Sequence, residues 1–127
     1  MQELLLNNYP LEKGPKVVAI GGGTGLATLL RSIKTLTHNI TAVVAVTDDG
    51  GSSGVLRREM GILPPGDIRN CLIALAQEER GLAEMLDYRF TGEGFCRGHN
   101  MGNLLMAEMC IRDSSYTGQF LQRYLAK

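Results

Sequence analysis

The glycine-rich run at residues 21–25 constrains the fold of this chain more than any other feature. It follows residues 16–20, a short apolar and β-branched stretch typical of a strand buried on both faces of a parallel sheet. It precedes residues 26–36, where leucine and isoleucine recur at helical spacing. A second apolar run at residues 40–46 then predicts another buried strand. Residues 16–46 are therefore predicted to form one βαβ unit.

This order predicts an α/β fold with a Rossmann-like parallel sheet. Residues 1–15 are polar, contain two prolines, and are interpreted as an N-terminal arm, so that regular structure begins at Lys16. Residues 16–108 are interpreted as the N-terminal part of a nucleotide-binding domain. Only two strands are evident, whereas open α/β sheets usually have about five or six, so we expect a truncated sheet.

The tail, residues 109–127, departs from the pattern before it. The apolar helix that begins near Gly102 is predicted to be interrupted at residues 109–114. The sequence of these residues, MCIRDS, is also what one reading frame of a common sequencing adapter would encode. The tail is therefore interpreted as foreign to the domain. The alternative is an ordinary amphipathic helix with one face formed by Phe120, Leu121, Tyr124 and Leu125.

The glycine run is a candidate phosphate site. Backbone N–H groups and the positive end of the helix dipole converge there without side-chain obstruction, and a threonine hydroxyl adds a donor. The run is not a Walker A loop, and Leu26 occupies the place of the last glycine in G-x-G-x-x-G. A tight turn without a ligand is the alternative. The candidate ligand-binding residues are Gly21, Gly22, Gly23, Thr24 and Gly25.

A flexible polar loop, residues 47–54, is predicted to follow the second strand and to form the other half of the same crevice. Asp48 and Asp49 stand about where a dinucleotide fold places the acid that binds ribose hydroxyls. They are equally candidate ligands of Mg²⁺, and a solvated turn is a third interpretation. Gly50 and Ser52 complete the candidates in this loop.

Two later helix starts carry the remaining candidates. Asp67 is predicted to be the N-cap of a helix over residues 68–79, and together with Arg69 and Asn70 it either caps that helix or contacts an anion. His99 is interpreted either as an acid, a base or a phosphate donor, or as a structural histidine. Asn100 and Asn103 flank it. No serine, histidine and acid arrangement is evident from spacing, so no catalytic residue is assigned.

Charge and cysteine usage exclude several classes of protein. Thirteen basic and thirteen acidic residues cancel, which gives no reason to expect a nucleic acid or a membrane surface as partner. The three cysteines have no C-x-x-C spacing, and no signal peptide or membrane segment is evident. We therefore expect a cytoplasmic protein with reduced thiols.

Four motifs, VVAIGGGTGLATLLRSIK, AVTDDGGSSGVLRREMGILPPGDIRNCLIALA, YRF and GHNMGNLL, together resemble the gluconeogenesis factor family, within the superfamily of 2-phospho-L-lactate transferases. The resemblance covers residues 16 to about 106. The resemblance implies a Rossmann-like fold, binding of a nucleotide sugar such as UDP-N-acetylglucosamine, and regulation of growth on gluconeogenic carbon sources and of cell shape. It places the family's signature positions on residues 21–25, 48–49, 64–67, 69–70, 99–100 and 103. It favours a regulator over an enzyme.

Two other functions stay open at this point. One is a Mg²⁺-dependent transferase of phosphoryl-linked groups, in which Asp48 or Asp49 holds the metal while arginines neutralise phosphates. The other is an NAD-binding module, which the irregular glycine spacing favours less. The sequence does not decide between a monomer and a homo-oligomer.

Overall fold

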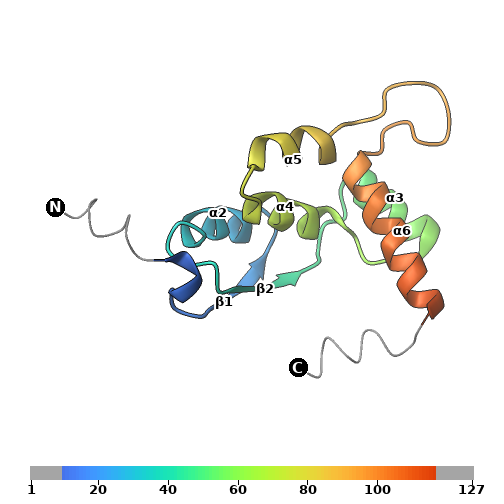
Figure 1. The fold of residues 1–127 in the computed structure, drawn as a ribbon. Coiled ribbons are helices and arrows are strands. Elements are labelled where there is room, and N and C mark those ends of the chain that lie inside the picture. The colour runs from blue at the N-terminus through green and yellow to red at the C-terminus, as the bar shows by residue number, and fades with distance from the viewer. Residues whose placement is uncertain (1–9, 117–127) are drawn as a thin grey trace.

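The computed structural model describes residues 10–116, which form a small parallel sheet and a set of helices (Figure 1). The elements in chain order are η1 (Leu11–Lys13), β1 (Val17–Gly22), α2 (Gly23–Ile33), β2 (Ile40–Ala45), α3 (Gly51–Met60), α4 (Gly66–Leu75), α5 (Glu79–Leu86) and α6 (Met101–Tyr116). None of the described helices is long and apolar enough to cross a membrane.

β1 and β2 form the predicted parallel pair. Their register runs from Val17 opposite Ile40 to Gly22 opposite Ala45, and α2 makes the connection between them. The βαβ unit and the α/β fold class are thus confirmed. Because the strands are parallel, both end at the same edge of the sheet, and the segments that follow them begin there.

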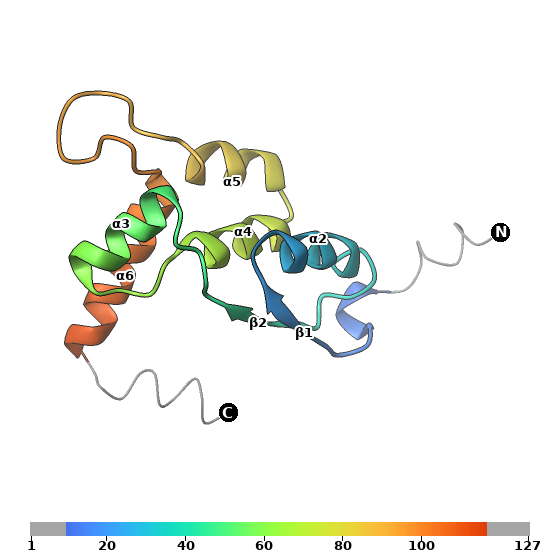
Figure 2. The same cartoon turned by 180° about the vertical axis from the view of Figure 1, so that it is seen from behind.

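One face of the sheet carries the core. α2 and α4 pack side by side on this face, as both views of the ribbon show (Figures 1 and 2). Leu30 of α2 is fully buried, and removal of such a side chain from water contributes about 1.5–3 kcal/mol. The buried residues of this cluster are Ala19, Leu26, Ala27, Leu30, Cys71 and Ala74.

The prediction that the first strand is buried on both faces is wrong for the described residues, and the second strand is also partly exposed. Val18 is 64% exposed, Ile20 is 74% exposed and Val43 is 48% exposed. Successive strand residues point to opposite faces, and the helices that pack on the sheet cover the other face. In the described part of the chain, a continuous apolar run therefore does not show whether one or both faces of a strand are covered.

The glycine run is not a five-residue loop. Gly21 and Gly22 are the last two residues of β1, and Gly23 is the first residue of α2. The whole change of direction falls on Gly23, whose φ of 53° lies in the left-handed region that favours glycine. Strand and helix therefore meet without an intervening loop.

Residues 51–60 form the helix α3, which begins inside the flexible loop predicted for residues 47–54. The helix begins at Gly51, with a φ of 45°, and is closed by Gly61 in the left-handed conformation. Its glycines and serines are poor helix formers, which explains the wrong prediction. Leu56 and the two serines are nevertheless buried, so tertiary packing stabilises the helix.

Regular structure begins before Lys16, contrary to the prediction. The 3-10 turn η1 is tied to the α2–β2 connection through Asn39, whose Nδ2 donates to the carbonyls of Glu12 and Gly14 at 2.8 Å. The predicted interruption at residues 109–114 is also wrong, because α6 continues to Tyr116. The four residues of the alternative amphipathic face, Phe120, Leu121, Tyr124 and Leu125, lie outside the described residues.

Candidate functional site

Three helices begin near the edge of the sheet where β1 and β2 end. A methyl group placed on Gly23, the first residue of α2, would lie 3.2 Å from Asp67 Oδ1 of α4. One placed on Gly66, the first residue of α4, would lie 2.1 Å from Asp48 Oδ2, in the loop that leads into α3. The close approach of the Asp67 and Asp48 carboxylates to these glycines brings the starts of α2 and α4 and the loop before α3 to one place.

Asp67 connects two of these segments. Its carboxylate is buried, and Oδ2 accepts hydrogen bonds from the backbone N–H groups of Thr47 at 3.0 Å and Asp48 at 3.2 Å. The prediction that Asp67 caps its own helix is wrong, because the N-cap residue is Pro65 and Asp67 lies in the first turn. The side chain instead satisfies two amides at the end of β2, which fixes the loop on α4.

The two acids after β2 do different things. Asp48 Oδ1 accepts a hydrogen bond from the N–H of Gly50 at 3.0 Å, so this carboxylate holds its own turn in shape. Asp49 is largely exposed and pairs with Arg57 Nη1 at 2.7 Å. Within the described residues, no three histidine, cysteine, aspartate or glutamate side chains gather as a metal site.

Arg69 ties α4 to α6 and α5. Its Nη1 donates to Asn103 Oδ1 at 2.7 Å, and Asn103 Nδ2 donates in turn to Ser53 Oγ at 3.1 Å. Arg69 Nε lies 3.1 Å from Asp87 Oδ1 as an ion pair, although its N–H does not align as a hydrogen bond. Arg69 and Asn103 thus position the helices around the site.

Ser52 and His99 form a buried pair that spacing in the sequence did not reveal. Ser52 Oγ and His99 Nδ1 lie 2.9 Å apart, between residues 47 positions apart in the chain. Asn100, beside them, is 4% exposed, and its Oδ1 has no partner among the described residues. The start of α6 therefore packs on the start of α3 through polar side chains. His99 therefore contacts α3 through Ser52 and has a packing role there, different from that of the glycine turn.

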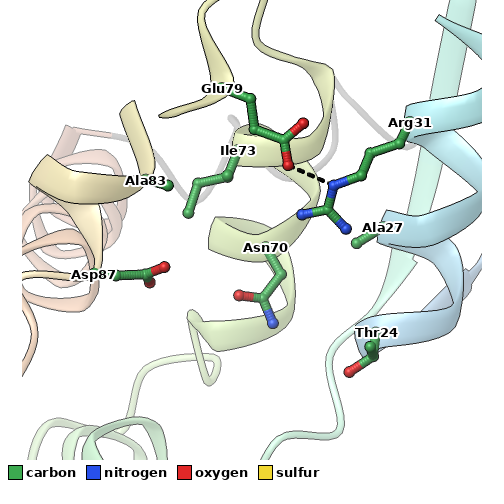
Figure 3. Close-up of a pocket in the computed structure, with 8 residues that line it drawn as sticks. All are labelled: Thr24, Ala27, Arg31, Asn70, Ile73, Glu79, Ala83 and Asp87. Atoms are coloured by element: carbon green, nitrogen blue, oxygen red, sulfur yellow. Dashed lines mark hydrogen bonds and ion pairs between the residues drawn. The ribbon is translucent and has the colours of Figure 1, made fainter. Parts of the chain in front are cut away.

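Thr24 and Asn70 open on a pocket between α2, α4 and α5 (Figure 3). The pocket has a volume of about 270 Å³. Arg31 and Glu79 close one end of it with a direct ion pair. Sequence reasoning missed this pocket, since its lining comes from three helices and no local motif marks it. The lining residues are Thr24, Ala27, Arg31, Asn70, Ile73, Glu79, Ala83 and Asp87.

A sequence model of the family described as 2-phospho-L-lactate transferase CofD matches residues 17–122 of this chain. The chain belongs to the CofD family. The match begins at β1 and includes every helix start described above.

Curated CofD-family relatives carry a more specific name. The chain is 56% identical over 124 residues to a putative gluconeogenesis factor of Nostoc sp., and 57% identical over 104 residues to one of Thermoanaerobacterium thermosulfurigenes. These alignments cover 98% and 82% of this chain, but 26% and 32% of the relatives. The chain therefore spans between a quarter and a third of their length.

A crystal structure of a CofD-family relative from Bacillus halodurans has the same fold. It superposes with a TM-score of 0.71 at 50% sequence identity, over 80% of this chain and 33% of the relative. A second crystal structure of the same protein, described as a member of the UPF0052 family, gives a TM-score of 0.70. The Rossmann-like α/β fold of this CofD-family chain thus has experimental counterparts.

The predicted site residues of this CofD-family chain fall into two groups. The first lies around the helix starts at the end of the sheet and consists of Gly21, Gly22, Gly23, Thr24, Gly25, Asp48, Asp49, Gly50 and Asp67. The second lies at the start of α3, on α4 and at the start of α6, and consists of Ser52, Arg69, Asn70, His99, Asn100 and Asn103. The structure thus brings the first group to the sheet edge and uses most of the second in helix packing.

Proposed function

We propose that this chain carries the phosphate-binding part of a nucleotide-sugar-binding regulator of gluconeogenic growth and cell shape. The observation that carries the proposal is the open first turn of α2. Its N-cap is Gly22, which has no side chain to cap the turn, and a methyl group placed on Gly25 would meet no atom within 4 Å beyond its chain neighbours and the backbone of its own helix. The first amides of a helix have no partner within the helix, so this turn offers donors to a phosphate at the carboxyl end of a strand.

The names of the relatives support the regulatory role. The Nostoc and Thermoanaerobacterium proteins are called putative gluconeogenesis factors, and the Bacillus subtilis relative, 48% identical over 106 residues, is called a gluconeogenesis factor. The first group of site residues would hold the phosphates, with Asp67 keeping the loop after β2 in place. The partner is then a small nucleotide ligand such as UDP-N-acetylglucosamine, bound in the cytoplasm without a nucleic acid or a membrane.

A second candidate function is a Mg²⁺-dependent transferase of phosphoryl-linked groups. The match to the transferase family model favours it. Of the two acids that follow β2, Asp49 is the more available to a metal, since it is exposed and Arg57 is its ion-pair partner among the described residues. Metal-dependent turnover of a phosphoryl-linked substrate, lost in Asp49→Asn, would support this function. Metal-independent binding without product would contradict it.

The experiment that tests the regulator is calorimetric titration of UDP-N-acetylglucosamine and NAD into the 127-residue chain and into a family-length protein. Cooperative unfolding is checked first for both. We expect UDP-N-acetylglucosamine to bind and NAD not to compete. Competition by NAD alone would favour a dinucleotide-binding module, and failure of both proteins to bind the UDP-sugar would overturn the proposal.

The variant Gly25→Ala tests whether the phosphate binds at the first turn of α2. The added methyl group has free space in the protein, so stability is retained, yet it stands where a phosphate would approach the backbone. We expect UDP-sugar affinity to fall about tenfold or more. Gly81→Ala is the matched control in α5, where the nearest atom to an added methyl group is Glu78 Cγ at 3.6 Å. Equal affinity of the two variants would place the phosphate elsewhere.

A further inference from the structure

The acidic turn, residues 47–50, is held at both ends by side chains from other elements. At its β2 end, the Asp67 carboxylate of α4 accepts hydrogen bonds from the first two backbone N–H groups of the turn. At its other end the chain enters α3, whose first turn contains the buried serines Ser52 and Ser53. Two separate anchors therefore decide where the acidic turn lies.

The anchor on α3 comes from the start of α6 and the residues just before it. Ser52 Oγ lies 2.9 Å from His99 Nδ1. Ser53 Oγ accepts a hydrogen bond from Asn103 Nδ2 at 3.1 Å. Each of the four residues is at most 8% exposed, so the loss of one partner leaves the other buried without it, at a cost in free energy. Two adjacent serines thus tie the start of α3 to the start of α6.

Backbone pairing fixes the place of His99 itself. The N–H of Phe90 donates to the carbonyl of His99 at 3.0 Å. The N–H of Met101 donates to the carbonyl of Tyr88 at 2.8 Å. The loop that this pairing closes, drawn in orange between α5 and α6, extends away from the helices (Figures 1 and 2). The imidazole is therefore presented to α3 from a backbone that is held on both sides.

The first turn of α3 packs directly on the acidic turn. A methyl group placed on Gly54 would lie 2.2 Å from the backbone oxygen of Asp49. One placed on Gly66 would lie 2.7 Å from Ser53 Oγ and 2.1 Å from Asp48 Oδ2. Contacts as close as these leave no free space, so a shift of α3 has to move the acidic turn with it.

We propose that His99 is a positioning residue for the proposed phosphate site. Through Ser52 it holds the first turn of α3, and that turn holds the acidic turn, which Asp67 joins to the start of α2. Its effect on a ligand is indirect, because its Nδ1 already binds Ser52. The inference rests on the proposed function for the ligand, whereas the link from His99 to the acidic turn depends on these contacts alone.

Hydrogen exchange of backbone amides in the 127-residue chain, followed by NMR, measures this link without any ligand. One reporter is the N–H of Gly50, which donates to Asp48 Oδ1 at 3.0 Å. The other is the N–H of Gly54, which donates to the carbonyl of Gly50 at 3.1 Å. The reference is the N–H of Val17, which donates to the carbonyl of Asn39 at the other end of the sheet. Exchange relative to this reference separates local opening from global unfolding.

Four variants isolate the role of the imidazole. His99→Leu removes its nitrogen atoms, whereas His99→Asn keeps a polar group close to the position of Nδ1. Ser52→Ala removes the same contact from the α3 side, and it replaces His99→Leu if that variant does not unfold cooperatively. Thr37→Val is the matched control, because Thr37 is fully buried before β2 and its Oγ1 donates to the carbonyl of Pro15 at 2.9 Å.

We expect His99→Leu to speed exchange of both reporters about tenfold relative to the reference, and to weaken UDP-N-acetylglucosamine binding about as much. His99→Asn should restore both quantities. His99→Leu should add nothing in a Ser52→Ala background, since the contact is already lost there. Thr37→Val should lower the thermal stability without a selective change at the reporters.

A direct ligand contact of His99 would give a different result. Affinity that falls in His99→Leu with unchanged reporters, or that falls further in the Ser52→Ala background, would overturn the positioning role. Equal changes at the reporters in Thr37→Val would overturn it too, because they would show a general loss of stability. If neither the 127-residue chain nor the family-length protein binds UDP-N-acetylglucosamine, the proposed function fails, and the exchange rates alone support or overturn the link from His99 to the acidic turn.

Discussion

The Asp67 carboxylate accepts a hydrogen bond from the backbone N–H of Thr47 at 3.0 Å, across 20 positions of the chain. The same oxygen accepts from the N–H of Asp48 at 3.2 Å. A buried carboxylate on α4 therefore holds the loop at the end of β2. The position of the turn at Asp48 and Asp49 therefore depends on the Asp67 side chain as much as on the sequence of the turn itself.

Asp67→Ala should destabilise the fold. The substitution removes the acceptor of two backbone N–H groups, and the loss of such a partner costs about 1–3 kcal/mol. Asp67→Asn keeps one carbonyl oxygen and should recover part of that loss. Urea unfolding of the three proteins measures the free energies, and an alanine variant as stable as the original chain would contradict the role given to Asp67.

Gly66→Ala should destabilise, although Gly66 lies in a helix where alanine is normally the better residue. The added methyl group would lie 2.1 Å from Asp48 Oδ2 and 2.7 Å from Ser53 Oγ, so overpacking should cost about 1–3 kcal/mol. Gly81→Ala in α5 meets no such contact and should stabilise by up to about 1 kcal/mol. Thermal unfolding of both variants should show shifts of opposite sign. Shifts of the same sign would show that the packing at Gly66 is looser than described.

Glu79 should contribute stability that depends on pH. Its pKa is lowered chiefly by the hydrogen bond from Arg31, so the folded state binds the proton less readily than the unfolded state does. The contribution is thus fully present above the ordinary value near 4.5 and is lost as the pH falls through the lower folded value. The difference in unfolding free energy between the original chain and Glu79→Gln should therefore shrink in acid. A difference that stays constant from pH 7 to acid would argue against the ion pair.

Cys71 should react slowly with alkylating agents in the folded chain. Burial, and secondly the negative charge of Asp67, raises the pKa of its thiol, and the side chain is 3% exposed. Cys96 is only partly buried and serves as the internal comparison. Mass spectrometry of iodoacetamide-treated protein at pH 8 should show Cys96 modified before Cys71, with the difference lost in urea. Equal rates in the native chain would contradict the packing of α4 on the core.

Sequence patterns predicted the βαβ unit well, because buried strands and an amphipathic helix leave a local signature. They failed at α3, where two glycines and two serines read as a loop and burial of Leu56 and the serines decides otherwise. They failed also for the outer sheet face, since Ile20 and Ala19 are both apolar in sequence, while Ile20 is exposed and Ala19 is buried.

By itself, the sequence determined that a strand ends in glycines, that a helix starts there, and that two acids follow the next strand. These are properties of neighbouring residues, fixed by backbone conformation and hydrophobic periodicity. Only the tertiary structure decided that Asp67 binds the loop after β2, that Ser52 meets His99, and that α2, α4 and α5 enclose a pocket. Such contacts join residues far apart in the chain, and their geometry depends on how whole helices pack, which no local pattern encodes.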